Sequence, residues 1–438
     1  MKRVRVVGGG SSPGSAPRGA RVLVVGGGGR EHALAWALAR SASVGEVMSS
    51  PGNPGCAEIG PLLPDPGDVR ELAARAVEAG VDLVVVGPEA PLVAGLADAC
   101  RERGLAVYGP DAATARLEAS KVGAKAFMLR HGVPTAEARV SRSEAEALEH
   151  VRAHERAGGA PLVIKRSGLA GGKGVTVPED LGGAEAAVRA AFRAGDAEVL
   201  LEERLSGQEV SLLVICDGER ALPLRLAQDY KQALEGDRGP MTGGMGCVAP
   251  VELLDEAELE DVMARVVRPT LRGLAEEGTP FVGTLFVGLM LTEAGPKVLE
   301  YNVRFGDPEI QSLLPLLDED LYELLAAAAR GELGERSLRW RDGAAACVVL
   351  AAPGYPEAPE TGTPIYLPGD LGEGVIVFQA GTRREGERLV SAGGRVLNVV
   401  GLGADRREAV ARAYSAVSTI GFRGAHYRRD IGARLEAL

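Results

Sequence analysis

The chain has 438 residues, of which 46% are hydrophobic and 25% charged, with five cysteines and a net charge of −11. This length exceeds a single hydrophobic core and predicts roughly two to four domains, while the negative charge argues against nucleic acid or an anionic membrane as a partner. The cysteines are scattered and form no Cys-x-x-Cys pair, which indicates reduced thiols of a cytoplasmic protein rather than disulfides or a zinc site.

The first 20 residues, "MKRVRVVGGGSSPGSAPRGA", are rich in Gly, Ser, Pro and Arg and lack the apolar middle of a signal peptide, so we predict a disordered tail. From residue 21 the pattern alternates between β-branched runs, such as "RVLVVG" and "VDLVVVG", and apolar-periodic helices. Strands separated by helices predict a parallel sheet that is covered on both faces and ends at about residue 110.

The pattern changes twice in the rest of the chain. Residues 111–134 predict a pair of helices, and a small α/β unit follows at residues 161–203. Strands dominate residues 209–302, interrupted by a helix at about 255–277. A glycine-rich β section with one closing helix follows residue 335, and we expect a linker near residues 331–336.

A glycine- and lysine-rich segment, "VIKRSGLAGGKGV", follows an apolar run at residues 163–175. The P-loop pattern G-x-x-x-x-G-K-[ST] does not fit, because the glycine spacing is one residue short and Gly174 takes the place of the hydroxyl residue. Lys165 at the end of a strand and Lys173 in a glycine turn instead suit a flap over nucleotide phosphates. The alternative is a flexible surface loop with solvated lysines.

Two later motifs favour the nucleotide interpretation. In "LLEERLSGQEV" the carbonyl of Glu202 and the N–H of Leu205 could bind a purine, and Glu209 could hold ribose hydroxyls, although an exposed acidic turn is the alternative. In "VLEYNVRFGDPE" the period of a strand predicts Glu300, Asn302 and Arg304 on one face, where acid and amide oxygens suit Mg²⁺ and the arginine suits a phosphoryl group. A salt-bridged strand end is the alternative here.

These motifs, in this order, resemble those of the ATP-grasp superfamily. Over residues 21–438 the chain resembles the phosphoribosylamine–glycine ligase family, in segments that include "GGREHALAWALA", "PGNPG", "VGPEAPLVAGLAD", "GPMTGGMG", "EYNVRFGDPE" and "GGRVLNVVGLG". The resemblance implies an α/β fold with an N-terminal parallel α/β domain at 21–120 and an ATP-grasp domain at 121–334. It also implies a small mobile lid at roughly 139–203 and a C-terminal β-rich α+β domain at 335–438.

The resemblance implies ATP-dependent ligation of glycine to 5-phosphoribosylamine through glycyl phosphate, in purine biosynthesis. The implied cofactors are ATP with Mg²⁺ or Mn²⁺, and the partners are these small molecules, with a monomeric enzyme and neither nucleic acid nor a membrane. Three alternatives stay open at the level of sequence: a related ligase that uses formate or bicarbonate, an NAD-dependent oxidoreductase built on the glycine run at residues 26–29, and a catalytically inactive nucleotide sensor.

The resemblance also assigns roles residue by residue. The implied nucleotide contacts are Lys121, Lys165, Gly168, Gly171, Gly172, Lys173, Gly174, Val175, Glu202, Leu205 and Glu209, and the implied metal ligands are Glu300 and Asn302. The implied catalytic residues are Arg304, Lys231 and Asp229, and the implied substrate contacts are Gly29, Asn53, Glu89, Thr242, Gly243, Gly244 and Asp307. The chain departs from the family pattern at Arg166 and Ser167, beside Lys165, and at Met241, where asparagine is usual.

Overall fold

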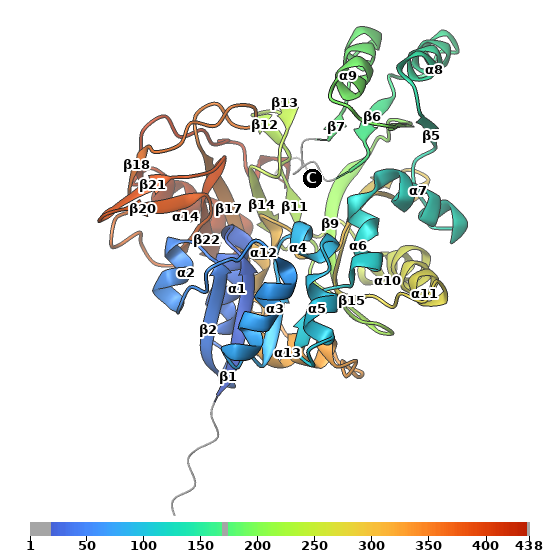
Figure 1. Ribbon diagram of the computed structural model, residues 1–438. Coiled ribbons are helices and arrows are strands. Elements are labelled where there is room, and N and C mark those ends of the chain that lie inside the picture. Colours follow the sequence, from blue (N-terminus) through green and yellow to red (C-terminus); the bar gives the residue numbers. More distant parts are fainter. Residues whose placement is uncertain (1–18, 169–173, 436–438) are drawn as a thin grey trace, which may run out of the picture.

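The computed structural model describes residues 19–168 and 174–435, so almost all of the predicted tail lies outside the described residues (Figure 1). The N-terminal layer is a parallel sheet in the order β2-β1-β3-β4, made of β1 (Ala20–Gly26), β2 (Val44–Pro51), β3 (Leu83–Val86) and β4 (Ala106–Tyr108). Its helices are α1 (Gly29–Leu38), α2 (Pro54–Ile59), α3 (Val69–Glu78), α4 (Glu89–Val93) and α5 (Leu96–Arg101). The predicted parallel layer is confirmed, and the loops that enter α1 and α4 leave from the carboxyl edge of the sheet.

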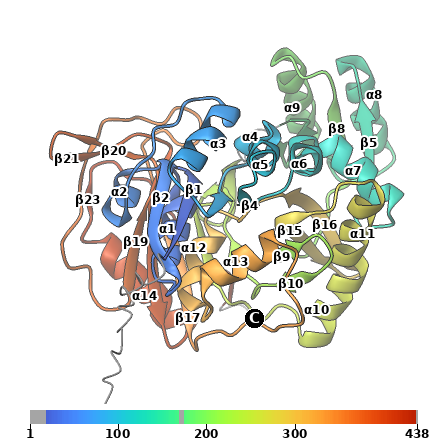
Figure 2. The same cartoon turned by 60° about the horizontal axis from the view of Figure 1, so that its bottom comes forward.

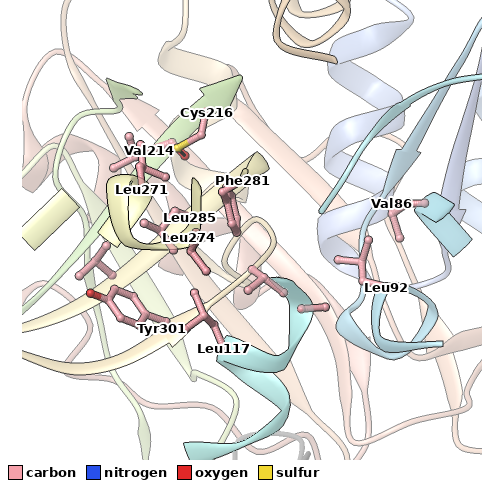
Figure 3. Close-up of a cluster of buried hydrophobic side chains, with 14 of the residues drawn as sticks. Val86, Leu92, Leu117, Val214, Cys216, Leu271, Leu274, Phe281, Leu285 and Tyr301 are labelled. Carbon is pink, nitrogen blue, oxygen red and sulfur yellow. Dashed lines mark hydrogen bonds between the residues drawn. The ribbon is translucent and has the colours of Figure 1, made fainter. Parts of the chain in front are cut away.

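The central region is built on an antiparallel sheet. Helices α6 (Ala112–Ala119) and α7 (Lys121–Arg130) lead into it, and its order is β10-β9-β15-β16. The strands are β9 (Gln208–Asp217), β10 (Ala221–Pro223), β15 (Val282–Thr292) and β16 (Gly295–Asn302), with α10 (Glu256–Val262) and α11 (Arg268–Glu276) packed nearby. One apolar cluster joins this sheet to the N-terminal layer: it includes Phe281 and Leu285 from the sheet region, Leu117 from α6, and Val86 and Leu92 from the layer (Figure 3).

A small subdomain projects from this body, as Figures 1 and 2 both show. Its sheet has the order β5-β8-β6-β7, with β5 (Ala138–Ser141), β6 (Val163–Arg166), β7 (Val175–Thr176) and β8 (Val199–Glu202). Helices α8 (Glu144–Arg156) and α9 (Leu181–Arg193) pack against each other and against the sheet, around a separate core that includes Val151, Ile164 and Val188. This unit therefore has an apolar interior of its own, distinct from the core of the main body.

The C-terminal part contains a five-stranded sheet in the order β11-β14-β17-β22-β19. The strands are β11 (Gln228–Asp229), β14 (Gly246–Ala249), β17 (Ala344–Ala351), β19 (Val375–Gln379) and β22 (Arg395–Gly403), and α14 (Arg406–Val417) packs on it. Both β11 and β14 precede residue 334; β11 pairs with β14, and β14 pairs with the later strand β17. The sheet therefore spans the predicted division between the central and C-terminal domains.

Smaller elements complete the fold. A second antiparallel sheet has the order β20-β21-β18-β23, with β18 (Pro364–Tyr366), β20 (Thr382–Glu385), β21 (Arg388–Ser391) and β23 (Gly421–Phe422). A hairpin is formed by β12 (Gln232–Leu234) and β13 (Arg238–Met241), and α12 (Glu309–Leu313) and α13 (Leu321–Ala329) follow the central sheet. All five cysteines are buried and free, and none of the described helices is long and apolar enough to cross a membrane.

Candidate active site

A cavity of about 540 Å³ lies where the N-terminal layer, the central sheet, the small subdomain and the C-terminal sheet meet. Most of the predicted site residues line it together: Glu89, Lys121, Lys165, Gly168, Gly174, Val175, Glu202, Leu205, Glu209, Asp229, Lys231, Thr242, Gly243, Glu300, Asn302, Arg304 and Asp307. Gly171, Gly172 and Lys173 lie outside the described residues. Residues that are far apart in sequence thus converge on one cavity.

A larger surface groove of about 1070 Å³ has none of these residues in its wall. It lies between the β9–β10 hairpin, α11 and residues 334–337. Two of its four arginines, Arg220 and Arg336, follow an acid of the lining in the sequence, and the other two, Arg268 and Arg272, form exposed ion pairs with Glu260 and Glu276. The groove therefore presents no strong net charge, and the chemistry of the molecule lies in the smaller cavity.

Lys165 is held by a buried carboxylate that is paired with two lysines. Its Nζ lies 2.8 Å from Oε2 of Glu202 and donates to the carbonyl of Leu299 at 2.8 Å, while Nζ of Lys125 lies 3.1 Å from the other oxygen of Glu202. The sequence predicts only a backbone role for Glu202 and no role for Lys125. The departure at Arg166 does not disturb this arrangement, because its guanidinium turns away to Asp196, at 2.5 Å and 3.1 Å.

Lys121 begins α7 and reaches the cavity beside the glycine segment. Its Nζ donates to the carbonyl of Gly168 at 3.3 Å. Burial lowers the pKa of Lys121, and the nearby Glu300 partly opposes this change. Gly168 has a φ of +118° with open space around it, so the chain enters the glycine segment in a conformation that favours glycine.

The acidic centre of the cavity is Glu300 on β16. Burial acts to raise the pKa of Glu300, but Lys231, Lys165 and Lys121 outweigh it and hold the pKa at about 2. Nζ of Lys231 lies 3.4 Å from Glu300 and contacts Glu209, so carboxylates keep the pKa of Lys231 above its usual value against the effect of burial. Glu300 is therefore ionised near neutral pH and available to a cation.

The residues present fit a hydrated magnesium ion rather than an all-protein metal cage. Among the described residues, no group of three or more His, Cys, Asp or Glu side chains could hold a metal. Glu300 and Asn302, two residues apart on β16, offer one carboxylate and one amide oxygen. Mg²⁺ is commonly held by one or two carboxylates together with substrate phosphates and water, so this pair suits a metal that arrives with a nucleotide.

Arg304 differs in one respect from the sequence expectation. The predicted strand face over Glu300, Asn302 and Arg304 is wrong at its last member, because β16 ends at Asn302 and Arg304 lies in the bend that follows. Its Nη2 still lies 3.2 Å from Oδ1 of Asn302 and 2.8 Å from Glu118, and its Nε lies 3.4 Å from Glu89. Nε is buried and makes no hydrogen bond of good geometry, so its contact with Glu89 is an ion pair only.

The opposite wall is formed by the turn at residues 242–244 and by Asp307. Oγ1 of Thr242 donates to the carbonyl of Lys231 at 2.7 Å and accepts from the N–H of Gly244 at 3.0 Å. The carboxylate of Asp307 accepts from Nε2 of Gln311 at 2.7 Å. Burial acts to raise the pKa of Asp307, but Arg395 and Arg30 outweigh this effect and lower it.

Three predicted substrate contacts, Gly29, Asn53 and Gly244, are not among the residues that line the cavity. Gly29 packs so closely against Asn398 that a Cβ would lie 2.0 Å from Nδ2 of that residue. Nδ2 of Asn53 donates to the carbonyl of Gln379 at 2.8 Å, while its Oδ1 caps α2. Gly29 and Asn53 therefore connect the N-terminal layer to the C-terminal sheet, and their contact with a substrate stays a prediction.

Several polar residues of the wall were not predicted: Arg30, Glu118, Lys125, Glu309 and Arg395. Arg30, Glu309 and Arg395 stand inside segments that carry the family resemblance, so those segments contained a usable signal. Lys125 is four residues after Lys121 on α7, which places both lysines on one helix face. Glu118 is an acid in an ordinary helical pattern and is identified only by its contact with Arg304.

Two lysines from separate elements and an acid–amide pair around one cavity, with a small subdomain and a central antiparallel sheet beside it, define an ATP-grasp enzyme. Three family models match the chain: "Phosphoribosylglycinamide synthetase, ATP-grasp (A) domain" at residues 119–310, its N domain at 20–118 and its C domain at 345–434. The chain belongs to the phosphoribosylamine–glycine ligase family. This membership replaces the oxidoreductase alternative.

Individual relatives support the same assignment over nearly the whole chain. The phosphoribosylamine–glycine ligase of Caulobacter vibrioides is 48% identical, covering 94% of this chain and 98% of its own, and that of Streptomyces coelicolor is 47% identical, covering 94% and 99%. The crystal structure of the Thermotoga maritima ligase has a TM-score of 0.80 at 36% identity, covering 94% of this chain and all of that one. A biotin carboxylase domain from Hydrogenobacter thermophilus, with 21% identity and a TM-score of 0.70, shares the fold.

Proposed function

We propose that the cavity joins glycine to 5-phosphoribosylamine at the expense of ATP, giving glycinamide ribonucleotide, ADP and phosphate. The observation that carries the proposal is the convergence of Lys121, Lys165, Glu300 and Arg304 on one cavity in a chain of this ligase family. A carboxylate is a poor acyl donor, so glycine first takes the terminal phosphoryl group of ATP. The amine of phosphoribosylamine then attacks the glycyl carbon, and phosphate leaves.

The nucleotide is assigned to the side of the cavity that faces the small subdomain. Lys121 and Lys165 bind its phosphates, and Glu202 orients Lys165 through the 2.8 Å ion pair. Gly168, Gly174 and Val175 line the same side of the cavity and are assigned to the phosphates, and the backbone of Glu202 and Leu205 binds the adenine. Glu209, which contacts Lys231 in this structure, binds the ribose hydroxyls. Such positioning, together with charge stabilisation, supplies most of the catalysis in phosphoryl transfer.

Glu300 and Asn302 are assigned to the divalent cation, for which Mg²⁺ and Mn²⁺ are both suitable. When bound, the cation neutralises charge on the nucleotide phosphates. Arg304, fixed by Glu118 and Glu89, stabilises the charge of the phosphoryl group in transfer. The monomeric state and the cytoplasmic location of the enzyme stay predictions.

Asp229, Lys231, Thr242, Gly243 and Asp307 are assigned to the glycine and acceptor side. Burial raises the pKa of Asp229 well above its usual value, although Lys231 opposes this. Asp229 lines the cavity, and its Oδ2 lies 4.0 Å from Nζ of Lys231. On this geometry we assign the pair to the proton that the attacking amine loses when the amide forms.

The test is ADP release in a reconstituted reaction. Purified protein with ATP, Mg²⁺, glycine and freshly prepared phosphoribosylamine should release ADP and form glycinamide ribonucleotide in equal amounts, and omission of any one component should stop it. Formate or bicarbonate in place of glycine is the matched control, because either would replace glycine in the related ligase reactions. If the rate of ADP release does not depend on glycine, the proposed function is wrong.

A further inference from the structure

Arg395 reaches the active site from the C-terminal part of the chain. It is the first residue of β22, and its side chain lines the cavity. Its Nη1 donates to the carbonyls of Gly243 at 2.6 Å and Asp307 at 2.7 Å, with the carbonyl of Gly244 at 3.3 Å. Its Nη2 lies 3.3 Å from the carboxylate of Asp307. One guanidinium therefore joins two loops that are more than sixty residues apart in the sequence.

The two glycines of the turn make this contact possible. A Cβ added to Gly243 would lie 3.1 Å from Cζ of Arg395, tighter than ordinary van der Waals contact. Gly244 has a φ of +110°, and a Cβ there would lie 2.5 Å from the ring of Pro308. The Gly-Gly pair of "MTGGMG" thus allows the guanidinium to approach backbone carbonyls that larger residues would shield.

The turn is also held by its other neighbours, so it has one defined position. Oγ1 of Thr242 donates to the carbonyl of Lys231, and the N–H of Gly243 donates to the hydroxyl of Tyr355 at 3.3 Å. Tyr355 and Arg395 both belong to the C-terminal part, and Gly394 packs against the Tyr355 ring, where a Cβ would lie 2.5 Å away. The C-terminal part therefore shapes this wall of the cavity, while Lys121, Lys165 and Glu300 come from other elements.

We propose that Arg395 is a positioning residue of the acceptor subsite, which sets the affinity for phosphoribosylamine by fixing the turn at residues 242–244 against Asp307. The inference rests on the proposed function and adds to it the element that builds the acceptor wall. Within the described part of the chain, the contacts of Arg395 go to the turn and to Asp307 and to none of the residues assigned to the nucleotide, so its loss should affect acceptor binding and leave ATP binding unchanged.

The test compares Arg395→Gln and Arg395→Lys with Arg384→Gln, a matched control in the same part of the chain whose arginine is exposed and paired with Glu58. KM for phosphoribosylamine is measured at saturating ATP and glycine, and Kd for ATP by equilibrium titration. We expect KM to rise at least about tenfold in Arg395→Gln, since several charge-assisted hydrogen bonds are lost. Arg395→Lys should recover part of this loss, because its ammonium still donates, and Kd for ATP should stay within about twofold.

Gly243→Ala gives a second, independent arm. Gly243 does not have a positive φ, so alanine fits its backbone and perturbs mainly the contact with Arg395. It should raise KM for the acceptor in the same selective way. In the double variant Gly243→Ala and Arg395→Gln, the two increases in acceptor KM should not add. Both substitutions remove the same interaction, between the turn and Arg395.

Three results would overturn the inference: an unchanged acceptor KM in Arg395→Gln, an equal loss of ATP affinity, or additive effects in the double variant. If circular dichroism shows that Arg395→Gln is unfolded, the acceptor KM and the ATP Kd of Arg395→Lys and Gly243→Ala test the inference by the same criteria. If the wild-type protein releases no ADP when glycine is added, the proposed function is wrong, and this inference falls with it.

Discussion

Arg304 is a half-buried cation whose charge is balanced by two acids, Glu118 and Glu89, before any substrate arrives. Burial acts to lower the pKa of Arg304, but Glu118 and Glu89 outweigh it and raise the pKa. We predict that Arg304→Ala lowers kcat by about 10²- to 10³-fold, because the charge that it stabilises develops only during transfer. Kd for ATP should change little. Single-turnover rates and an equilibrium ATP titration measure the two quantities separately.

The control for this prediction is Arg304→Lys. Lysine keeps the positive charge opposite Glu118, so the buried carboxyl group does not lose its partner, but lysine cannot contact Asn302, Glu118 and Glu89 with one planar group. Its kcat should lie between those of the alanine variant and the unchanged enzyme. If ATP affinity falls as far as kcat does, Arg304 binds the ground state and its assigned role is wrong.

His32 gives the contact between the N-terminal layer and the C-terminal sheet a pH dependence. The residue is 8% exposed, its Nδ1 accepts from the N–H of Gln379 at 2.8 Å, and burial lowers its pKa from 6.5 to about 4. As the pH falls, the unfolded chain therefore takes up a proton on this histidine before the folded protein does. Its contribution to stability is complete above pH 6.5 and is lost as the pH falls towards 4, by at most about 3 kcal/mol.

We predict that His32→Asn flattens this part of the stability profile. The asparagine Oδ1 can accept the hydrogen bond from Gln379 but does not titrate. The measurement is the urea midpoint of both proteins at pH values above, within and below the window, where the difference between the two should change most inside it. A constant difference across all pH values would show that His32 does not change its protonation on unfolding.

At the scale of elements, local patterns predicted most of the secondary structure. The run "LVVV" forms β3, which is buried along its whole length, as a strand covered on both faces requires. The helix predicted at about 255–277 is present but is interrupted by a π-helical turn (Met263–Val267). Pro269 lies two residues after this turn. Its ring would clash with the carbonyl four residues earlier in a regular α-helix, so the proline was the local signal for this change.

The sequence pattern did not predict which distant strands pair with one another. The run "AAACVVLA" predicts a strand, and β17 is fully buried, but nothing local states that β17 lies between β14 and β22. Arg395 and the bridge of Lys125 and Glu202 went unpredicted for the same reason, because their partners are set by the sheet order and not by spacing along the chain. Glu300 and Asn302 were predictable, since the period of one strand places them together.

At the scale of the whole molecule, the C-terminal sheet determines how the chain can be divided. Strand β14 pairs with β17 from Gly246 opposite Val348 to Ala249 opposite Ala345. The side chains of Cys247 and Val248 are fully buried in this arrangement. A cut at the predicted boundary after residue 334 would therefore leave β14 without its neighbour β17 and turn an interior strand into an exposed apolar edge.

We predict that a fragment of residues 19–334 does not fold by itself, although it contains every residue assigned here to ATP and to the metal. It should be poorly soluble, bind a hydrophobic dye and lack a cooperative thermal transition, since strand β14 loses its partner and the wall around Asp307 loses Arg395. Co-expression with residues 335–438 is the control, because it restores β17 and β22 without the covalent link. A monomeric fragment that melts cooperatively and binds ATP would show that the central region is an independent domain and that the sheet forms only after it has folded.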